Sequence, residues 1–240
     1  NEEVSRSGCT GLGWSLHNDI SVPYIVRYGS DYQKKRYLPR CVSGELITAI
    51  AMTEPGAGSD LQGTKTTAVL DGENYILNGS KTFITNGQKA GLVIVVAKTD
   101  TSAGSKGISL FLVEADFPGF SKGKNLNKLG LKAQDTSELF FQDVKVPKEN
   151  LLGEEGRGFI YLMQDLPQER LSIGVTAVAN AQAILEATIA YTKDRKAFGT
   201  TVASFQNTQF KLAELAAEVT SAEVFCDRCT ELLLEDKLDT

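Results

Sequence analysis

The sequence has few of the side chains that hydrolytic and metal-dependent sites use. His17 is the only histidine among 240 residues. A site built from several histidines therefore cannot form, and any Ser-His-Asp or Cys-His arrangement would depend on this one imidazole. We expect no bound metal ion and a structural role for His17.

Cysteine is also scarce. The chain has four, too few and too irregularly spaced for a disulfide framework, which favours a reducing compartment. They are Cys9, Cys41, Cys226 and Cys229. The last two form a CxxC, but this pair stands alone on an apolar helical stripe, so a zinc or thioredoxin-like site is disfavoured.

Long runs of basic or apolar residues are missing as well. The net charge is −5, and without clustered basic residues we expect no nucleic-acid partner. The cluster YQKKRYLPR at 32–40 is interpreted as a solvated helix face, although it could attract the phosphates of a ligand. No apolar stretch approaches the roughly 20 residues that span a bilayer and no signal-like segment opens the chain, so we expect no membrane span.

What is present indicates one or two globular domains, because 42% of the residues are hydrophobic. Helical patterns are followed by strand patterns and then by helical patterns again, which disfavours a doubly wound parallel sheet. We predict an α+β fold in three parts: the helical end of an N-terminal domain at 1–47, a central antiparallel, barrel-like β-domain at 48–157, and the first helices of an incomplete helical bundle at 158–240. Both ends of the chain are expected to continue in a longer protein.

Local signals refine this outline. Asp71-Gly72 and Asn78-Gly79 flank a short apolar run and both indicate hairpin turns. The apolar positions of the segment 137–146 shift phase once, which predicts a bulge or a bend. Gly29, Ser30 and Asp31 can cap a helix at its N-terminus.

Two long helices are predicted after residue 158, joined through RKAFGTTVASFQ at 195–206. Their apolar stripes are Leu171, Val175, Val178, Ala181, Leu185 and Ile189 in the first, and Leu212, Leu215, Val219, Ala222, Cys226, Cys229 and Leu233 in the second. Pro167 predicts a kink or a restart of the first helix, because proline removes a backbone donor and clashes with the preceding turn.

The most specific segment is AMTEPGAGSDLQG, at 51–63. Its glycines let the backbone approach a flat or phosphorylated ligand, and the hydroxyls of Thr53 and Ser59 could bind the polar edge of a heterocycle. The segment is neither a Walker A loop nor a GxGxxG fingerprint. Taken alone, it is as easily a simple turn.

This segment resembles a signature of the acyl-CoA dehydrogenase family at every position. The likeness continues through FIT at 83–85, VKVPKENLLGEEGRGF at 144–159 and RKAFG at 195–199, and it covers nearly the whole chain. Several motifs in the right order are more specific than any one of them.

The resemblance implies an FAD site. Phe83 stands where many relatives have Trp, Thr85 would hydrogen-bond flavin N5 and Thr53 the pyrimidine edge, although a plain core aromatic is the alternative for Phe83. Arg195 and Gln206 would reach the FAD of a neighbouring subunit, which implies a homo-oligomer, expected to be a tetramer; a local ion pair with Asp194 is the alternative for Arg195. The implied cofactor-binding residues are Ile50, Ala51, Met52, Thr53, Glu54, Pro55, Gly56, Ala57, Gly58, Ser59, Phe83, Ile84, Thr85, Arg195 and Gln206.

The resemblance also implies a catalytic carboxylate. Most members of the family hold it on a loop beyond the two long helices, whereas the long-chain and isovaleryl types hold it on the first of them. LPQERL at 166–171 matches the second arrangement, in its long-chain form, so Glu169 is the expected base; a surface Glu-Arg pair is the alternative. The implied substrate-binding residues are Ser59, Pro167, Gln168, Glu169 and Arg170.

The implied activity is the α,β-dehydrogenation of fatty acyl-CoA thioesters to trans-2-enoyl-CoA in fatty acid β-oxidation. The chain would then be a flavoprotein oxidoreductase that passes electrons to electron-transfer flavoprotein. It would work in the cytoplasm of a bacterium or in the mitochondrial matrix of a eukaryote. An acyl-CoA oxidase and a non-catalytic acyl-CoA or flavin-binding scaffold remain open alternatives.

Overall fold

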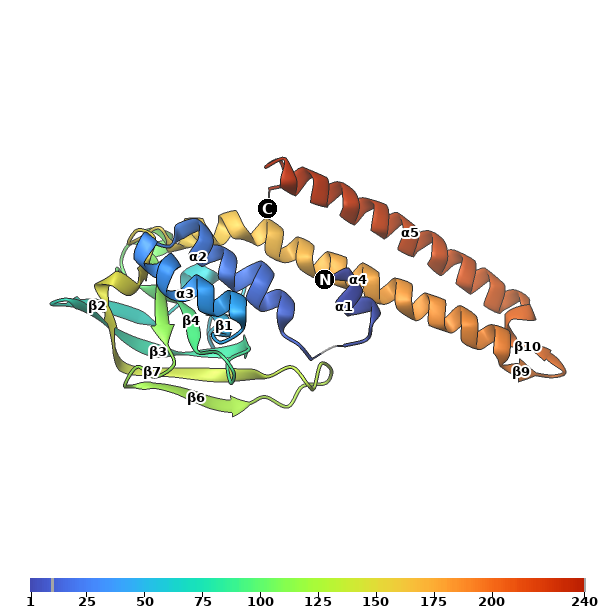
Figure 1. Ribbon diagram of the computed structural model, residues 1–240, viewed down its shortest axis with the longest axis horizontal. Helices are drawn as coiled ribbons and strands as arrows, with labels where there is room; N and C mark the ends of the chain where they lie inside the picture. The colour runs from blue at the N-terminus through green and yellow to red at the C-terminus, as the bar shows by residue number, and fades with distance from the viewer. Residues whose placement is uncertain (10, 240) are drawn as a thin grey trace. The chain divides into compact units, whose positions relative to one another are not determined.

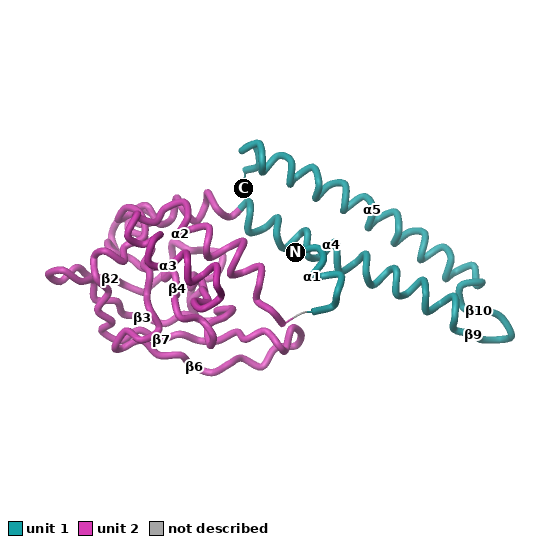
Figure 2. Tube along the Cα trace, in the orientation of Figure 1, with its two compact units in different colours: residues 1–10, 167–240 teal, residues 11–166 magenta. Residues whose placement is uncertain are grey.

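The computed structural model describes residues 1–9 and 11–239. The chain forms two compact units, one of residues 11–166 and one of residues 1–10 with 167–240 (Figure 2). The first strand begins at Thr48 and the long helix α4 at Gly158. The compact units divide the chain at other places, so the three-domain division at 1–47, 48–157 and 158–240 stays a prediction.

The secondary structure follows the predicted order of helices, strands and helices (Figure 1). The helices are α1 Glu2–Arg6, a π-helical turn Leu16–Ser21, α2 Val22–Tyr28, α3 Asp31–Ser43, α4 Gly158–Asp194 and α5 Gln206–Leu234. The strands are β1 Thr48–Ala51, β2 Thr67–Asp71, β3 Asn74–Thr85, β4 Leu92–Lys98, β5 Ile108–Glu114, β6 Phe120–Asn125, β7 Thr136–Pro147, β8 Leu151–Leu152, β9 Lys196–Ala197 and β10 Thr200–Thr201. Short 3-10 turns occupy Leu61–Gly63, Gly104–Gly107, Lys148–Asn150 and Val202–Ser204.

The sheet of the unit 11–166 is open. Its strands lie in the order β6-β7-β3-β2-β4-β5-β8, with β1 added to β4, so the expected barrel-like closure is wrong. The sheet is also mixed rather than purely antiparallel, because β1 runs parallel to β4 and β2 meets β4 in a single parallel bridge, Thr67 to Lys98. A single bridge gives little ladder bonding there, and the two end strands, β6 and β8, do not pair with each other.

Strands β4 and β5 are buried on both faces. In β4, Val93 and Val95 belong to one apolar core, whereas Leu92 and Ile94 belong to a second. Successive side chains of a strand point to opposite faces, so each face of this strand pair packs against a separate cover. Residues of β3 and β7 complete the first core, and residues of α2, α3 and the start of α4 complete the second.

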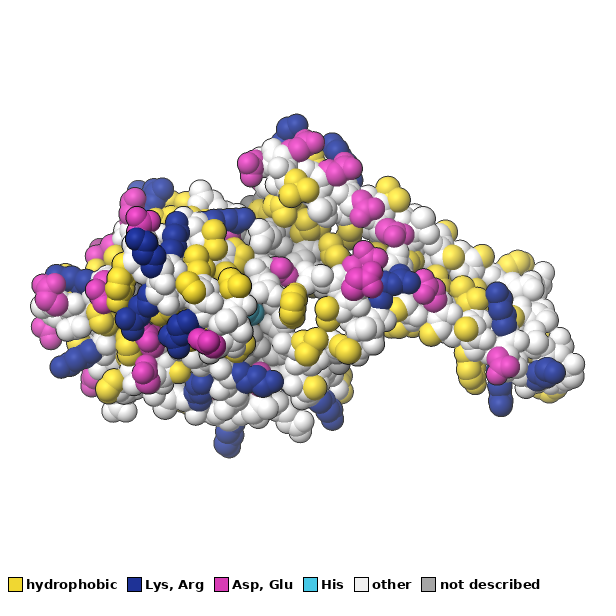
Figure 3. Space-filling model, viewed as in Figure 1, with side chains coloured by type: hydrophobic (Ala, Val, Ile, Leu, Met, Phe, Trp, Pro, Cys, Tyr) yellow, Lys and Arg dark blue, Asp and Glu magenta, His cyan; other side chains and the backbone are white. Residues whose placement is uncertain are grey.

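Helix α3 shows how the sequence sets the helical cover. Ser30 caps it as predicted, because its hydroxyl accepts the Gln33 backbone N–H while the Gln33 side chain accepts the Ser30 backbone N–H. Tyr37 is buried in the second core, and Lys35 and Arg36 are exposed. Basic side chains gather over α2 and α3 in Figure 3, so the predicted solvated face is confirmed.

Of the two predicted hairpin turns, one is confirmed. β2 and β3 are antiparallel and meet at Asp71 and Asn74, around Gly72. Asn78-Gly79 forms no turn and lies inside β3, where the register with β7 shifts. On the β7 side the shift falls between Phe141 and Val144, so the predicted bulge is confirmed.

His17 joins the segment before α2 to β1. Its Nδ1 accepts the Thr48 backbone N–H at 3.0 Å, and its Nε2 lies 3.2 Å from the Cys41 carbonyl. This pattern fits the neutral tautomer with the proton on Nε2. Nearby, the Asn86 amide donates to the carbonyls of Gly13 and Thr48. The histidine is therefore part of a buried polar network.

The other unit is a pair of long helices. α4 and α5 lie side by side and are joined by the β9–β10 hairpin (Figure 1), and a Cβ placed on Gly174 would be 3.7 Å from Cys226 Sγ. Arg6 of α1 pairs with Glu186 of α4 at 2.8 Å. Pro167 lies inside a continuous α4, so the predicted restart is wrong. None of the residues Gln206–Leu234 is buried.

Helix α4 is long and apolar enough, by length and composition alone, to cross a membrane. The expectation of no membrane span therefore stays a prediction. The finding is weak evidence for a membrane segment, because a core helix of a soluble bundle passes the same test.

Gly79 gives a test of the bulged strand. Its φ is +153°, and an added Cβ would lie 2.4 Å from Thr66 Oγ1 and 2.8 Å from Thr66 Cα. We expect Gly79→Ala to lower the free energy of unfolding by about 2–4 kcal/mol, from backbone strain together with overpacking. Urea denaturation measures the change.

The matched control is Gly44→Ala. Gly44 also has a positive φ, +79°, but an added Cβ would meet nothing within 4 Å. We expect a loss of only about 1 kcal/mol, from backbone strain alone. Equal losses for the two variants would contradict the steric role given to Thr66.

Candidate functional site

The glycine-containing loop after β1 is closed by its own backbone. Glu54 N–H donates to the Ala57 carbonyl at 2.9 Å, and Ala57 N–H donates to the Glu54 carbonyl at 3.2 Å. Pro55, within this turn, presets its own φ. A Cβ on Gly56 or Gly58 would meet nothing within 4 Å. The outer side of the loop is therefore open to a ligand.

A buried ion pair lies behind the loop. Lys81 Nζ donates to Glu54 Oε1 at 2.9 Å and to the Met52 carbonyl at 3.0 Å. The Glu54 carboxylate also accepts the backbone N–H groups of Lys65 and Thr66, at 2.7 and 3.0 Å. One carboxylate thus connects the start of the loop to the chain that leaves it.

The pair shifts the titration of both members. Burial lowers the pKa of Lys81 to about 8, against the opposing effect of the Glu54 carboxylate. Burial alone would raise the pKa of Glu54, but the Lys81 ammonium and the hydrogen bonds from Thr66 and Lys65 outweigh it and hold this pKa below its usual value. Glu54 is therefore firmly ionised at neutral pH.

Phe83 is held in an unusual conformation. Its φ is +59°, in the region that a bulky side chain enters only under strain, at a cost of about 1–3 kcal/mol. Its side chain is 67% exposed, so the alternative of a core aromatic is wrong. The register between β3 and β7 shifts between Lys81 and Ile84, and this irregularity turns the ring outward.

The structure brings the loop and the end of β3 together. Thr82 N–H donates to the Thr53 carbonyl at 2.9 Å. Within the described residues, no hydrogen bond takes up the hydroxyls of Thr53, Ser59 or Thr85, and these side chains are half-buried or exposed. By contrast, the side chains of Ile50, Ala51, Ala57 and Ile84 are buried in the unit, so only their backbone atoms could reach a ligand.

The predicted base lies near the start of α4. Glu169 is buried, 8% exposed, so the alternative of a solvated surface pair does not hold, although its neighbour Arg170 is exposed. Ser172 Oγ donates to the Glu169 carbonyl at 2.8 Å. Pro167 and Gln168 precede it within the helix, and the missing N–H of Pro167 leaves one carbonyl of the preceding turn without its helical donor.

Arg195 and Gln206 lie at the far end of the helix pair. Both are exposed, and Val202 N–H donates to the Arg195 carbonyl at 2.8 Å, which closes the hairpin. None of the salt bridges among the described residues involves Arg195. The alternative of an ion pair with Asp194 is therefore not seen.

Sequence reasoning missed two residues. By sequence, Lys81 is an ordinary polar position of a strand, because its neighbours Ser80 and Thr82 are also polar, and nothing local signals its burial. Phe198, 98% exposed with a φ of +53°, lies at the tip of the β9–β10 hairpin. The sequence feature that indicates its exposure is the pair Phe198-Gly199. A tight turn at this pair offers no core in which the ring could be buried.

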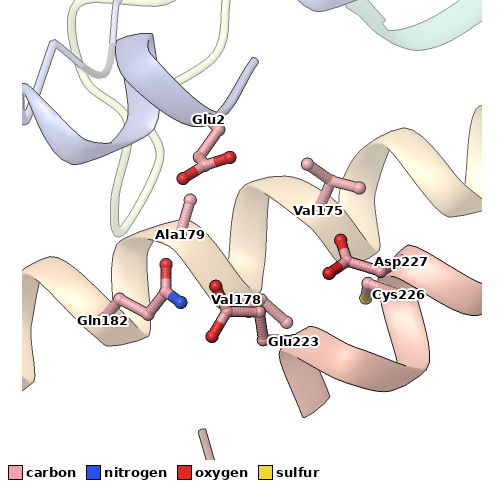
Figure 4. Close-up of a pocket in the computed structure, with 8 residues that line it drawn as sticks. All are labelled: Glu2, Val175, Val178, Ala179, Gln182, Glu223, Cys226 and Asp227. Carbon is pink, nitrogen blue, oxygen red and sulfur yellow. The ribbon is translucent and has the colours of Figure 1, made fainter. Parts of the chain in front are cut away.

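The helix-pair unit also has a small cavity, of about 40 Å³ (Figure 4). Glu2, Glu223 and Asp227 line it together with apolar side chains of α4. Sites for ligands of cofactor size are roughly ten times larger, and three carboxylates would repel phosphates. Among residues 1–9 and 11–239, no group of three His, Cys, Asp or Glu side chains could hold a metal ion.

Family models identify the chain along almost its whole length. The N-terminal, middle and C-terminal domains of acyl-CoA dehydrogenase match residues 1–45, 49–144 and 156–240. This chain belongs to the acyl-CoA dehydrogenase family. The family recognised in its motifs is therefore confirmed, and so is the α+β fold class predicted from the order of helical and strand patterns.

Individual relatives agree with this result. The mitochondrial long-chain specific acyl-CoA dehydrogenase of Sus scrofa is 55% identical over 100% of this chain, which covers 56% of that protein. The crystal structure of an acyl-CoA dehydrogenase from Geobacillus kaustophilus is 55% identical, with a TM-score of 0.96, over 98% of this chain and 63% of that one. The chain thus spans little more than half the length of the curated relatives it matches.

Two further structures bear on the cofactor and on electron transfer. Acyl-CoA dehydrogenases are FAD-dependent flavoproteins, and one from Bacillus anthracis, complexed with FAD, is 41% identical, with a TM-score of 0.87, over 92% of this chain and 38% of that one. A structure described as the electron transferring flavoprotein of Acidaminococcus fermentans is 40% identical, with a TM-score of 0.93, over 98% of this chain and 62% of that one.

The Glu54 carboxylate predicts an acid-dependent loss of stability. Because its pKa is lower in the folded protein than the usual 4.5, its contribution is fully present above that pH and is lost as the pH falls through the folded value. At pH 7 we expect the free energy of unfolding of Glu54→Gln to be about 3 kcal/mol lower than that of wild type. The difference in unfolding free energy between wild type and the variant should become smaller between pH 5 and pH 3, as measured by urea denaturation.

Glu73→Gln is the matched control, because Glu73 pairs with Lys148 in the same unit but is 89% exposed. Its variant should differ from wild type by less than about 1 kcal/mol throughout this range. A Glu54→Gln gap that stayed constant from pH 7 to pH 3 would contradict the depressed pKa.

Proposed function

We propose that the protein containing this chain removes the α-proton and the β-hydride of a fatty acyl-CoA thioester, giving the trans-2-enoyl-CoA. The observation that carries the proposal is Glu169, a buried carboxylate on α4 two residues after a helical proline. Proton abstraction from a carbon next to a thioester needs one well-placed base. The 55% identity to a long-chain specific enzyme supports a long acyl chain as substrate and a role in fatty acid β-oxidation.

The helix gives the base its fixed position. A side chain on a regular helix has few rotamers, and burial of Glu169 restricts them further. The bound thioester would present its α-carbon to this carboxylate, which takes the proton. Pro167, Gln168 and Arg170 occupy the same turns of α4 and would contact the acyl-CoA.

The loop and the end of β3 fit a flavin. The free hydroxyls of Thr53 and Thr85 would donate to its polar edge and to N5, and the outward ring of Phe83 would contact the isoalloxazine. The open space around Gly56 and Gly58 allows close backbone approach. When bound, FAD supplies the hydride acceptor that no side chain can provide.

The helix length supports an oligomeric site. Arg195 follows Glu169 by 26 positions, which at 1.5 Å per residue is about 39 Å along α4. One substrate and the reactive ring of one flavin cannot reach both residues. We therefore assign Arg195 and Gln206 to the FAD of a neighbouring copy, in a homo-oligomer that we expect to be a tetramer. The guanidinium offers phosphate oxygens a fixed fork of donors.

Electrons would leave through an electron-transfer flavoprotein. The likeness to the Acidaminococcus fermentans structure supports this partner. The similar long-chain specific enzyme of Sus scrofa is mitochondrial. The proposed location is the mitochondrial matrix in a eukaryote or the cytoplasm in a bacterium. An acyl-CoA oxidase would instead release peroxide, so reoxidation by the flavoprotein without peroxide is the expected outcome.

Glu169→Gln tests the base. In the complete protein the variant should retain FAD but reduce it about 10²–10⁴-fold more slowly with a long-chain acyl-CoA, because the amide cannot take the proton. Anaerobic bleaching of the flavin absorbance measures the rate.

Glu186→Gln is the matched control. Glu186 lies on the same helix and is exposed, and its variant should react at the wild-type rate. Unchanged bleaching by Glu169→Gln would favour a non-catalytic scaffold or a base elsewhere in the protein, and a wild type without flavin would exclude the proposal.

Phe83→Gly tests the strained aromatic. Removal of the ring should weaken FAD binding by about tenfold, equivalent to 1.4 kcal/mol. Unfolding free energy without flavin should stay within about 1 kcal/mol of wild type, because glycine relieves the positive φ. Fluorescence titration and urea denaturation measure the two effects.

The control for Phe83→Gly is Phe140→Gly. Phe140 is also exposed, at 42%, but lies in β7 without a positive φ. We expect the opposite pattern, with stability lowered by about 1 kcal/mol and FAD affinity unchanged. Equal FAD losses in the two variants would contradict a specific contact by Phe83.

A further inference from the structure

The interior of the unit 11–166 contains one lysine whose position is hard to explain by stability alone. The Lys81 side chain is 0% exposed and that of Glu54 is 6% exposed. Taking two charges out of water costs several kcal/mol per ion, and well-packed apolar residues of similar size often stabilise a fold as well. A buried ion pair instead fixes the geometry of the groups it joins, because each of its hydrogen bonds sets an angle and a distance.

The bonds of this pair all end on the segment from Met52 to Thr66, which contains the loop. Lys81 Nζ holds the Met52 carbonyl and Glu54 Oε1 at the entrance. The other contacts of the Glu54 carboxylate are the N–H groups of Lys65 and Thr66 at the exit. The Glu54 side chain thereby closes a stretch of twelve residues, from Glu54 to Lys65.

The same lysine belongs to the second segment of the candidate site. The residue that follows it, Thr82, donates its N–H to the Thr53 carbonyl at 2.9 Å, and the next, Phe83, has the strained φ of +59°. Three successive residues of β3 therefore contact the loop or present the exposed ring. A shift of Lys81 would move both segments.

We propose that Lys81 and Glu54 are a positioning pair that sets the spacing between the loop Met52–Ser59 and the segment Phe83–Thr85. The two segments then face one flavin at a fixed separation. This inference rests on the proposed function for the identity of the ligand. Neither residue reacts: Lys81 acts through the loop backbone, and Glu54 through Lys65 and Thr66.

The test compares Lys81→Met, Glu54→Gln and the double variant in the complete protein. Amide hydrogen exchange without flavin should show residues 54–66 exchanging at least about tenfold faster in each single variant. FAD should bind about tenfold more weakly or worse, by fluorescence titration. If the pair acts as one unit, the double variant should be no worse than the single variants.

Lys122→Met is the matched control. Lys122 Nζ also donates to two carbonyls in the same unit, those of Gln88 and Ala90, at 2.8 and 2.7 Å, but it makes no contact with the loop. Its variant should keep wild-type loop exchange and FAD affinity, even if its melting temperature falls.

A purely structural pair predicts something different. If Lys81→Met only lowered the melting temperature and matched Lys122→Met in loop exchange and FAD affinity, the proposal would be overturned. Glu54→Gln keeps the side-chain shape and serves as the deciding variant if Lys81→Met does not fold. Absence of flavin from the wild type would defeat the proposed function, whereas the exchange measurement without flavin still decides whether the pair holds the loop.

Discussion

The strand pair β4 and β5 is apolar on both faces, and this double burial sets the constraints for the whole unit 11–166. Two cores must form, one under the helices and one under β3 and β7. A sheet covered in this way leaves its ends as the places where irregular backbone meets solvent. The loop that follows β1 lies beside the end of β3, where Thr82 N–H donates to the Thr53 carbonyl.

Charge and strain are concentrated where these two segments meet. Most of the unit follows simple patterning, with apolar residues alternating between two cores. Around residues 52–54 and 81–83 the chain departs from it, with a buried lysine, a buried carboxylate and a phenylalanine at positive φ. Such departures lower the stability of a fold and are typical of functional sites, and the open hydroxyls of Thr53 and Thr85 lie within the same few residues.

Much of this could be predicted from the sequence, because it depends on local chemistry. The order of helices and strands, the Ser30 cap, the Asp71-Gly72 turn and the bulge before Val144 all follow from neighbours in the chain. Asn78-Gly79 misled, because the Asn78 side chain bonds across the bulge to Asp143, at 3.0 and 2.8 Å. The burial of Lys81 was invisible because its partner lies 27 positions away. The motif match located the loop, but only the fold shows what holds it.

Helix α4 limits the insertions and deletions that the chain can accept. Glu169 and Arg195 lie on and just after one continuous helix, so their separation and relative direction are set by helical geometry. Inserting or deleting one residue between them would rotate Arg195 by about 100° and move it by about 1.5 Å relative to Glu169. Substitutions on the solvent side of this helix leave that relation intact. We therefore expect this stretch to vary in composition among related chains while its residue count stays constant.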